Sequence, residues 1–454
     1  MEKAILGLIL FVVLVNFLTF NINPSYSWDE AVYLSMAEST YQGNKFCEIG
    51  GREFDLIDCS ARSRYFVYIL AGIFFVSGVN YAAIAFFISL ISALTILISY
   101  FLFKKLFDKE KSLLATLFIA TNYMFIFFSH RIMTEIISML FLTVGMYFFI
   151  GMLKEPHKIK NIIPLSLALG FLVMFRFNFI IIPVSMILYL VIFEMDLLAQ
   201  ILKSRKFYLG LVVFGTILSP QIFLLGKNIE YAGTTSFIPF HYFILFIPAA
   251  GILAPFMLYG IYLFFKGKRD KIIKFTLFFL LIFFLVTGYR LLSIRYLAPV
   301  IPVFAILSVY FLDFGKKKSV KIFALLAIIN IVVGYIAIIQ YISPIAGIDK
   351  FPEFISRKSY FDSNNVRKDA AIYIKDNTDE SSVILTNAPA WVWIYTHRKW
   401  IDLPDKEDEF NRILEENKNI DYLYVEPSKP YLYNSSKVEI INKTVFIEVY
   451  RVKV

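Results

Sequence analysis

Apolar stretches long enough to cross a lipid bilayer follow one another along most of this chain. A transmembrane helix needs about 20 mostly apolar residues, because inside the hydrocarbon its backbone polar groups must pair within the helix. Eleven stretches fit, near residues 4–20, 80–103, 112–128, 133–153, 161–175, 179–193, 207–225, 241–265, 275–289, 297–313 and 322–341. With 58% hydrophobic residues, the chain is predicted to be a polytopic α-helical membrane protein with about 11 transmembrane helices.

Basic residues are concentrated in short segments between these stretches. Residues 1–344 carry 29 basic and 17 acidic side chains. The excess lies mainly in the segments 104–111, 154–160, 203–206, 266–274 and 315–321. Loops rich in Lys and Arg stay in the cytoplasm, so topology explains the net charge of +10 without a nucleic-acid partner. The pattern predicts a plasma-membrane protein whose N-terminus is cytoplasmic and whose C-terminal part lies outside.

The first external loop is long and polar, which favours a function beyond connection. Residues 21–64 contain seven acidic and four basic side chains. The apolar segment 65–79 runs into the second span, and together they are too long for one crossing, so a helix along the membrane surface is expected here. Cys47 and Cys59 both lie in this loop, where a disulfide and two free thiols remain alternatives.

The residue pattern changes after the last apolar stretch, where long apolar stretches end. We expect a transmembrane domain at residues 1–344, with the external loop 21–79, and a small external α/β domain at 345–454. Helix and strand patterns alternate there and end in a hairpin pattern. The aromatic segment APAWVWIYTHRKW, residues 388–400, is predicted to be a buried strand; the alternative is an aromatic surface on which a sugar stacks.

Two adjacent carboxylates, Asp29 and Glu30, follow the first apolar stretch in the sequence SYSWDEAVYLSMAE. Ser27 has the position of an N-cap, and acids in the first turn of a helix are favourable. A helix capped in this way would also hold Asp29 rigidly, as a catalytic base must be held. A structural role and a catalytic role are both consistent with this stretch.

A second group of ionisable residues, His130, Arg131 and Glu135, lies between the third and fourth spans. A carboxylate at the head of an apolar span is costly and needs a reason. One reason is a structural ion pair between Glu135 and Arg131, four residues earlier. The other is a role in a functional site on the outer face of the membrane.

A third group, Arg290, Arg295 and Tyr296, precedes the tenth span on the same outer side, against the usual distribution of positive charge. Arginine suits bidentate contact with phosphate, and anchoring in lipid headgroups is the alternative. Arg62, Arg64 and Arg176 add to these outer cations. Acids and cations on one membrane face fit a reaction between a lipid-phosphate donor and an external acceptor, in which an acid takes the acceptor's proton.

No spacing of His and Cys predicts a zinc site. The carboxylates leave two alternatives open: no cofactor, or a hard divalent ion, Mg²⁺ or Mn²⁺. The ligands of such an ion would come from Asp29, Glu30, Glu135 and His130.

These motifs, in their order and sidedness, resemble the polytopic C-type glycosyltransferase superfamily, in particular its protein O-mannosyltransferase and aminoarabinose transferase-like group. The Asp-Glu pair after the first span is matched by WDEAVYLSMA, and the acid heading the fourth span by Glu135 in SHRIMTE. An Arg-Tyr before a late proline-containing span is matched by RYLAPVIP. Arg64 has the place of a basic residue before a surface helix, although the two prolines of that motif are missing.

The resemblance implies transfer of a sugar, with inversion, from a dolichyl- or undecaprenyl-phosphate donor to a protein, lipid or glycan acceptor at the outer membrane face. It implies that Asp29 is the base and that Glu30 and Glu135 orient the acceptor or a metal. The donor phosphate would be held by Arg64, Arg131, Arg290, Arg295 and Tyr296. The competing functions are a transporter or lipid flippase, which predicts ionisable residues in the middle of spans, and a non-catalytic membrane scaffold.

Overall fold

The structure is a computed structural model that describes residues 26–54, 62–155, 159–232, 254–266, 270–287, 294–310, 359–426, 435–444 and 447–453, with the single residues 7, 59, 325, 329 and 432. The chain divides into two compact units. We call Met1–Phe20, Ser63–Tyr65 and Ala82–Arg357 the helical unit. We call Asn21–Arg62, Phe66–Tyr81 and Lys358–Val454 the sheet unit.

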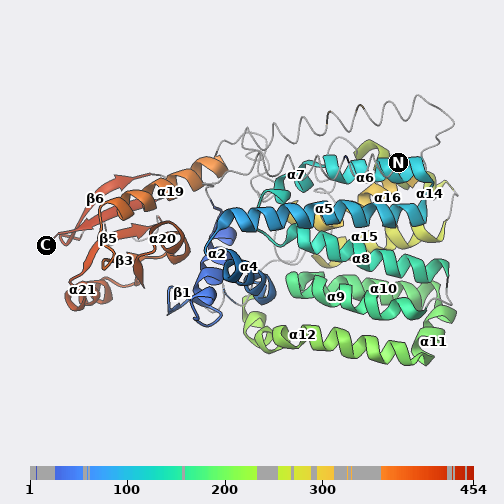
Figure 1. Ribbon diagram of the computed structural model, residues 1–454, viewed down its shortest axis with the longest axis horizontal. Helices are drawn as coiled ribbons and strands as arrows, with labels where there is room; N and C mark the ends of the chain where they lie inside the picture. The colour runs from blue at the N-terminus through green and yellow to red at the C-terminus, as the bar shows by residue number, and fades with distance from the viewer. Residues whose placement is uncertain are drawn as a thin grey trace. The chain divides into compact units, whose positions relative to one another are not determined.

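The helical unit is built from helices that run alongside one another (Figure 1). Its α-helices are α5 (Tyr81–Leu106), α6 (Lys109–Thr121), α7 (Tyr123–Ser129), α8 (Glu135–Lys154), α9 (Ile162–Phe175), α10 (Ile181–Phe193), α11 (Met195–Lys203), α12 (Arg205–Ala232), α14 (Ala254–Phe265), α15 (Lys271–Thr287) and α16 (Ile301–Tyr310). The 3₁₀ helices η1 (Ile159–Asn161), η2 (Phe177–Ile180) and η4 (Ile294–Val300) lie between them.

Two helices of the described residues, α5 and α8, are long and apolar enough to cross a membrane unbroken. Two bent pairs raise this number to four if each pair is one span: α6 with α7, bent by 58°, and Phe177–Phe193 with α11, bent by 116°. The expected number of about 11 spans stays a prediction, because the stretches 4–20 and 322–341 lie almost wholly outside the described residues. The predicted break between the fifth and sixth spans is confirmed, since Arg176 is non-helical between α9 and η2.

Small residues allow three of these helices to pack closely. A Cβ added to Gly170 of α9 would lie 3.0 Å from Ile217 Cδ1 of α12, and one added to Gly210 of α12 would lie 2.6 Å from Ser166 Oγ of α9. Gly145 of α8 faces Leu169 in the same way, at 3.3 Å. Close backbone approach at small residues is how helices associate where no water is expelled.

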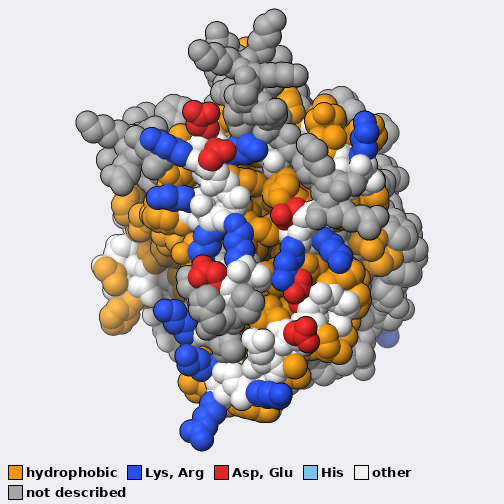
Figure 2. All heavy atoms as spheres, turned by 90° about the vertical axis from the view of Figure 1, so that its right-hand side faces the viewer, with side chains coloured by type: hydrophobic (Ala, Val, Ile, Leu, Met, Phe, Trp, Pro, Cys, Tyr) orange, Lys and Arg blue, Asp and Glu red, His pale blue; other side chains and the backbone are white. Residues whose placement is uncertain are grey.

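One end of the helical unit is strongly basic, and Figure 2 shows Lys and Arg side chains gathered on it. The described parts of the predicted basic segments contain Lys104, Lys105, Lys109, Lys111, Lys154, Lys160, Lys203, Arg205, Lys206, Lys266, Lys271 and Lys274. Acidic partners are interspersed, as in the 2.6 Å ion pair of Lys271 with Glu194. The segment 315–321 lies outside the described residues. Glu135 and Lys154 are the first and last residues of α8, about 30 Å apart, so Glu135 belongs to the opposite end.

The sheet unit contains a five-stranded sheet in the order β4-β3-β5-β7-β6 (Figure 1). Its strands are β3 (Val383–Thr386), β4 (Lys399–Asp402), β5 (Ile420–Val425), β6 (Val438–Lys443) and β7 (Glu448–Val452). The first three are parallel, and β6 and β7 form an antiparallel hairpin. Helices α19 (Ser359–Asp376), α20 (Pro389–Thr396) and α21 (Glu407–Glu416) complete this α/β fold. The expected small sheet-containing fold near the C-terminus and its terminal hairpin are therefore confirmed, whereas the domain bounds 345–454 and the external location stay predictions.

Side chains alternate between the two faces of this sheet. Phe410 of α21 packs in one core with Leu385 and Leu423. On the other face, the ring of Tyr422 lies 6.3 Å from that of Tyr373 in α19, and the hydroxyl of buried Tyr424 donates to a carbonyl of the same helix. Helices therefore cover both faces of the sheet.

The aromatic segment 388–400 differs from its prediction. It forms a buried helix, α20, followed by strand β4, rather than one buried strand. Pro389 stands in the first turn of α20, where its missing N–H costs nothing. His397 ends the helix in the left-handed conformation, with φ of 55°. Because Trp391, Trp393 and Tyr395 are buried, this segment is not the aromatic surface of the alternative prediction.

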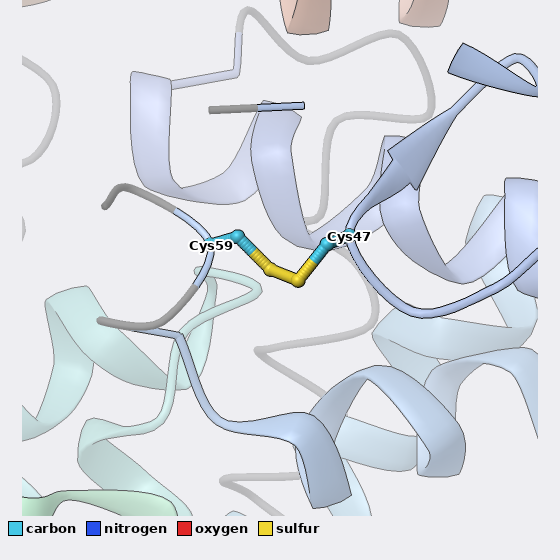
Figure 3. Close-up of a disulfide and its surroundings, with 2 residues drawn as sticks. All are labelled: Cys47 and Cys59. Carbon is cyan, nitrogen blue, oxygen red and sulfur yellow. A yellow bond between two sulfur atoms is a disulfide. The ribbon is translucent and has the colours of Figure 1, made fainter. Parts of the chain in front are cut away.

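The first loop belongs to the sheet unit and contains helix α2 (Trp28–Tyr41) and a short antiparallel pair, β1 (Glu48–Ile49) and β2 (Arg52–Glu53). The structure forms the disulfide between Cys47 and Cys59, with Cα atoms 5.5 Å apart (Figure 3). The apolar stretch that follows is divided as expected, into α4 (Arg64–Ser77) and α5, with Gly78 at φ of 67° between them.

Candidate active site

Helix α2 carries the Asp-Glu pair, and Ser27 is its N-cap as the sequence predicts. Glu30 closes a capping box: its Oε2 accepts from both the backbone N–H and the hydroxyl of Ser27, each at 2.9 Å. This exchange satisfies backbone donors that a helix start leaves unpaired. Because Glu30 is 2% exposed, its carboxylate fixes the start of the helix from inside the fold.

Asp29 stands beside Glu30 but in a more open position. Its Oδ1 lies 2.6 Å from Nη1 of Arg62, and the side chains of Asp29 and Arg62 are 17% and 12% exposed. The guanidinium of Arg62 also lies over the ring of Tyr33, 6.0 Å from its centroid. The pair orients the carboxylate, while both groups remain partly accessible to a molecule arriving from solvent.

A polar cluster at the other end of α2 was not predicted. Oε1 of buried Glu38 lies 2.8 Å from His397 Nε2, and its Oε2 accepts from the Tyr81 hydroxyl at 3.2 Å. The three residues come from α2, from the end of α20 and from the first residue of α5. A buried carboxylate needs such partners. In the sequence, only Glu38, a carboxylate inside the predicted helix, could have pointed to this cluster.

In the helical unit, the first residue of α8, Glu135, forms a buried ion pair with Arg176. The atoms Glu135 Oε1 and Arg176 Nη1 are 2.6 Å apart, and the side chains are 3% and 8% exposed. The predicted alternative, a helical pair of Glu135 with Arg131, is wrong: residues 130–134 are not helical, and among the described residues Glu135 pairs with Arg176.

The predicted residues Arg295 and Tyr296 join this pair in space, since α8 packs against η4. The guanidinium carbon of Arg176 lies 4.7 Å from the centre of the Tyr296 ring, and that of Arg295 lies 5.3 Å from it. Arg295 Nη2 also donates to the Tyr296 hydroxyl at 3.4 Å. We call Glu135, Arg176, Arg295 and Tyr296 the arginine–tyrosine cluster. Two guanidinium groups around one tyrosine favour an anion such as phosphate.

The other predicted residues of the helical unit are placed as follows. Arg131 is buried, and its guanidinium lies 5.8 Å from the ring centre of Phe127. Arg64 is the half-buried first residue of α4, a place where a cation is unfavourable unless an anion is near. His130 ends α7, and its Nδ1 lies 2.7 Å from the carbonyl oxygen of Ile126. Arg290 lies outside the described residues.

The described part of the chain does not assemble a metal centre: no group of three or more His, Cys, Asp or Glu side chains is found in it. The expected ligands are engaged elsewhere, Asp29 with Arg62, Glu30 with Ser27, Glu135 with Arg176 and His130 with Ile126. The divalent ion stays a prediction, and the roles proposed below are assigned to side chains of this chain.

Arg62 and Arg176 were noted as outer cations, but their pairing with Asp29 and Glu135 was missed. Each is separated from its acid by more than thirty residues in the sequence. The available signal was charge balance, because an acid that is buried near a membrane needs a cation as its partner.

Comparisons with known proteins bear on the fold of the chain. Residues 63–223 match the family model described as dolichyl-phosphate-mannose-protein mannosyltransferase, a range that begins after Arg62 and so leaves out Asp29. No curated protein matches the sequence significantly.

Solved structures match over nearly the whole chain. ArnT from Cupriavidus metallidurans, in a structure bound to undecaprenyl phosphate, matches with a TM-score of 0.70 and 11% identity, covering 99% of this chain and 98% of that one. The oligosaccharyltransferase of Archaeoglobus fulgidus matches with a TM-score of 0.58 and 13% identity, covering 93% and 69%. The archaeal oligosaccharyltransferase AglB, in a complex with an inhibitory peptide and a dolichol-phosphate, matches with a TM-score of 0.52 and 12% identity, covering 94% and 69%.

Identities this low establish fold rather than activity. The resemblance inferred from the sequence motifs is confirmed at that level: this chain has the fold of ArnT and of the archaeal oligosaccharyltransferase, and its residues 63–223 are similar to the mannosyltransferase family.

Proposed function

We propose that this protein is a membrane glycosyltransferase that moves a sugar from a polyprenyl-phosphate donor to a hydroxyl-bearing acceptor on the outer membrane face. The observation that carries the proposal is the arginine–tyrosine cluster in a chain that shares its fold, over 99% of its length, with a protein seen bound to undecaprenyl phosphate. A polyprenyl phosphate combines an apolar chain with an anionic head, which a helical membrane unit with buried arginines can hold.

In this proposal the donor phosphate is the leaving group. Arg295 and Arg176, oriented by Tyr296 and Glu135, stabilise the negative charge that grows on the phosphate as the bond to the sugar breaks. Arg64, Arg131 and Arg290 belong to the same proposed set. Glu135 keeps Arg176 in place, because a single buried guanidinium without a partner would be costly.

Asp29 takes the proton of the acceptor hydroxyl as that oxygen attacks the anomeric carbon of the sugar. Attack from the face opposite the phosphate inverts the anomeric configuration. Arg62 orients the carboxylate until the acceptor arrives, and Glu30 fixes the helix start that carries it. The exposure of Asp29, larger than that of Glu30, supports this division of roles.

The distribution of charge favours a transferase over a transporter. In α5 and α8, the two unbroken spans, charged residues occur only within the first or last turns, Lys104 and Lys105 in one and Glu135 and Lys154 in the other. An ion or proton relay would need ionisable groups near the middle of a span.

The test is consumption of labelled polyprenyl-phosphate sugars by the purified protein in lipid, across undecaprenyl and dolichyl chains and several sugars. We expect one donor to be turned over, and Arg295→Gln to raise the KM for that donor about tenfold or more, as loss of a charge-assisted phosphate contact does. Arg205→Gln, an exposed arginine at the basic end of the helical unit, is the matched control and should leave KM unchanged. No consumption of any donor would refute the proposal.

A further inference from the structure

The helix that carries Asp29 is enclosed rather than lying on a surface. Every residue of α2 from Glu30 to Ser39 is buried. Within the sheet unit α4 lines the helix, as the edge contact of Tyr33 with Phe66 at 4.9 Å shows. Helix α20 of the C-terminal domain lines it as well. A loop helix without an exposed stripe is unusual, and it means that the position of α2 is set by its neighbours.

Helix α20 bonds to α2 and to the residue that precedes its N-cap. The backbone N–H of Tyr26 donates to the Tyr395 hydroxyl at 2.8 Å, and the carbonyl of Tyr26 accepts from Trp391 Nε1 at 3.2 Å. Further along, the Ser35 hydroxyl donates to the carbonyl of Ala390 at 3.0 Å. Both polar groups of the Tyr26 backbone are thus held by side chains more than 360 residues away in the sequence.

Aromatic contacts reinforce these bonds. The ring of Trp28, the first residue of α2, lies 5.0 Å from that of Trp391 with their planes at 62°. The rings of Tyr26 and Tyr395 are stacked at 6.0 Å. Such ring pairs add stabilisation beyond the area they bury, and these flank Asp29 on the side that precedes it in the chain.

The first turn of a helix has no intrahelical partners for its N–H groups and is prone to fraying. A general base must be held to within about 0.5 Å of its working position, and an error of about 1 Å costs about a hundredfold in rate. The bonds to Tyr26 fix the chain two residues before the first turn of α2, and Arg62 holds the carboxylate itself.

We propose that Trp391 and Tyr395 are positioning residues for Asp29, so that the C-terminal domain completes the catalytic unit in addition to any contact it makes with an acceptor. This inference rests on the proposed function, because it takes Asp29 to be the base. On this proposal, the contacts of α20 raise kcat by positioning Asp29 and do not contribute to donor binding.

The test uses two tryptophans of the same helix. Trp391→Phe removes an indole N–H that donates to Tyr26, whereas Trp393→Phe removes one that is buried and has no hydrogen-bond acceptor among the described residues. Both substitutions replace an indole by the smaller phenyl ring, so the loss of side-chain volume is the same. We expect Trp391→Phe to lower kcat about tenfold or more at unchanged donor KM, and Trp393→Phe to change kcat less than twofold. Tyr395→Phe should resemble Trp391→Phe, since it removes the other bond to Tyr26.

A second readout is hydrogen–deuterium exchange of the peptide spanning residues 26–38 in the full-length protein. Its exchange should be faster in Trp391→Phe than in Trp393→Phe. Equal kcat values for the two variants, or a loss of kcat that follows only the loss of thermal stability, would overturn the proposal. If the unmodified protein turns over no donor, the proposed function fails, but the exchange comparison still decides whether α20 holds α2. Faster exchange in Trp391→Phe than in Trp393→Phe supports this role of α20, and equal exchange in the two variants overturns it.

Discussion

Glu135→Gln is the substitution whose consequence the structure predicts most sharply. It keeps the shape of the side chain but removes the negative charge that faces Arg176 at 2.6 Å, with both side chains more than nine-tenths buried. Among the described residues, the guanidinium of Arg176 would then have no counter-ion. Arginine cannot lose its proton to relieve this.

Removing one partner of a buried ion pair costs about 3 to 5 kcal/mol. In a chain of this size, at roughly 2 °C per kcal/mol, the apparent Tm should fall by about 6 to 10 °C. The double variant Glu135→Gln with Arg176→Gln removes both charges and should recover most of this loss, because a buried pair contributes little beyond its own desolvation cost. It should not recover activity, since the arginine that stabilises the leaving phosphate is gone.

The assay is thermal unfolding of the purified protein in detergent, followed by intrinsic fluorescence, for the wild type, both single variants and the double variant. Glu110→Gln, an exposed acid in the first turn of α6, serves as the control and should stay within about 0.5 kcal/mol. The buried-pair account would be refuted by a Glu135→Gln variant as stable as that control, or by a double variant whose loss of stability equals or exceeds the sum of the losses of the two single variants.

Three further predictions follow from other parts of the structure. Replacing Cys47 and Cys59 by Ser should cost about 3 kcal/mol, since the closed loop spans 12 residues, and reductant should lower the Tm of the wild type but not of the variant. Gly50→Ala should destabilise by about 2 to 4 kcal/mol, because φ is 59° and the new Cβ would lie 2.3 Å from Trp393; Gly43→Ala, with φ of 91° and nothing within 4 Å, should cost only the backbone part. Burial, and then the charge of Arg131, lower the pKa of His130 below the unfolded value of about 6.5 despite its bond to Ile126. The unfolded state therefore binds more protons, so stability should fall as pH drops from about 7 to 5, and less so in His130→Gln; equal slopes in Tm against pH would contradict this.

Much of the architecture could be predicted because it depends on local pattern. Apolar length predicted the long helices α5 and α8, Ser27 predicted the start of α2, and alternating side chains predicted the final hairpin. Segment 388–400 was assigned to the wrong element, since tryptophan, valine and tyrosine favour strands and the burial of α20 on all sides removed the helical stripe that would have shown otherwise. Pro389 in the first turn was the overlooked helix signal.

The candidate site was predictable in its residue types but not in its pairings. Glu135 and Arg295 could be singled out by their cost near a membrane, whereas the partner of each acid depends on which helices pack together. Arg176 reaches Glu135 because α8 packs against α9, a contact made possible by Gly145 against Leu169. Arg62 reaches Asp29 through a loop closed by the disulfide of Cys59. No local pattern encodes either event.

The central claim is that Asp29 deprotonates an acceptor that attacks a polyprenyl-phosphate sugar, and it is tested most directly by single-turnover transfer with an Asp29→Asn variant. Asparagine preserves the size of the side chain and can still face Arg62, but it cannot take a proton. With the donor that the wild type consumes, we predict a fall in the transfer rate of about a hundredfold or more, unchanged donor binding, and a product of inverted configuration from the wild type. Asp376→Asn, an exposed acid of α19, should transfer at the wild-type rate. Transfer by Asp29→Asn at the rate of that control would contradict the account.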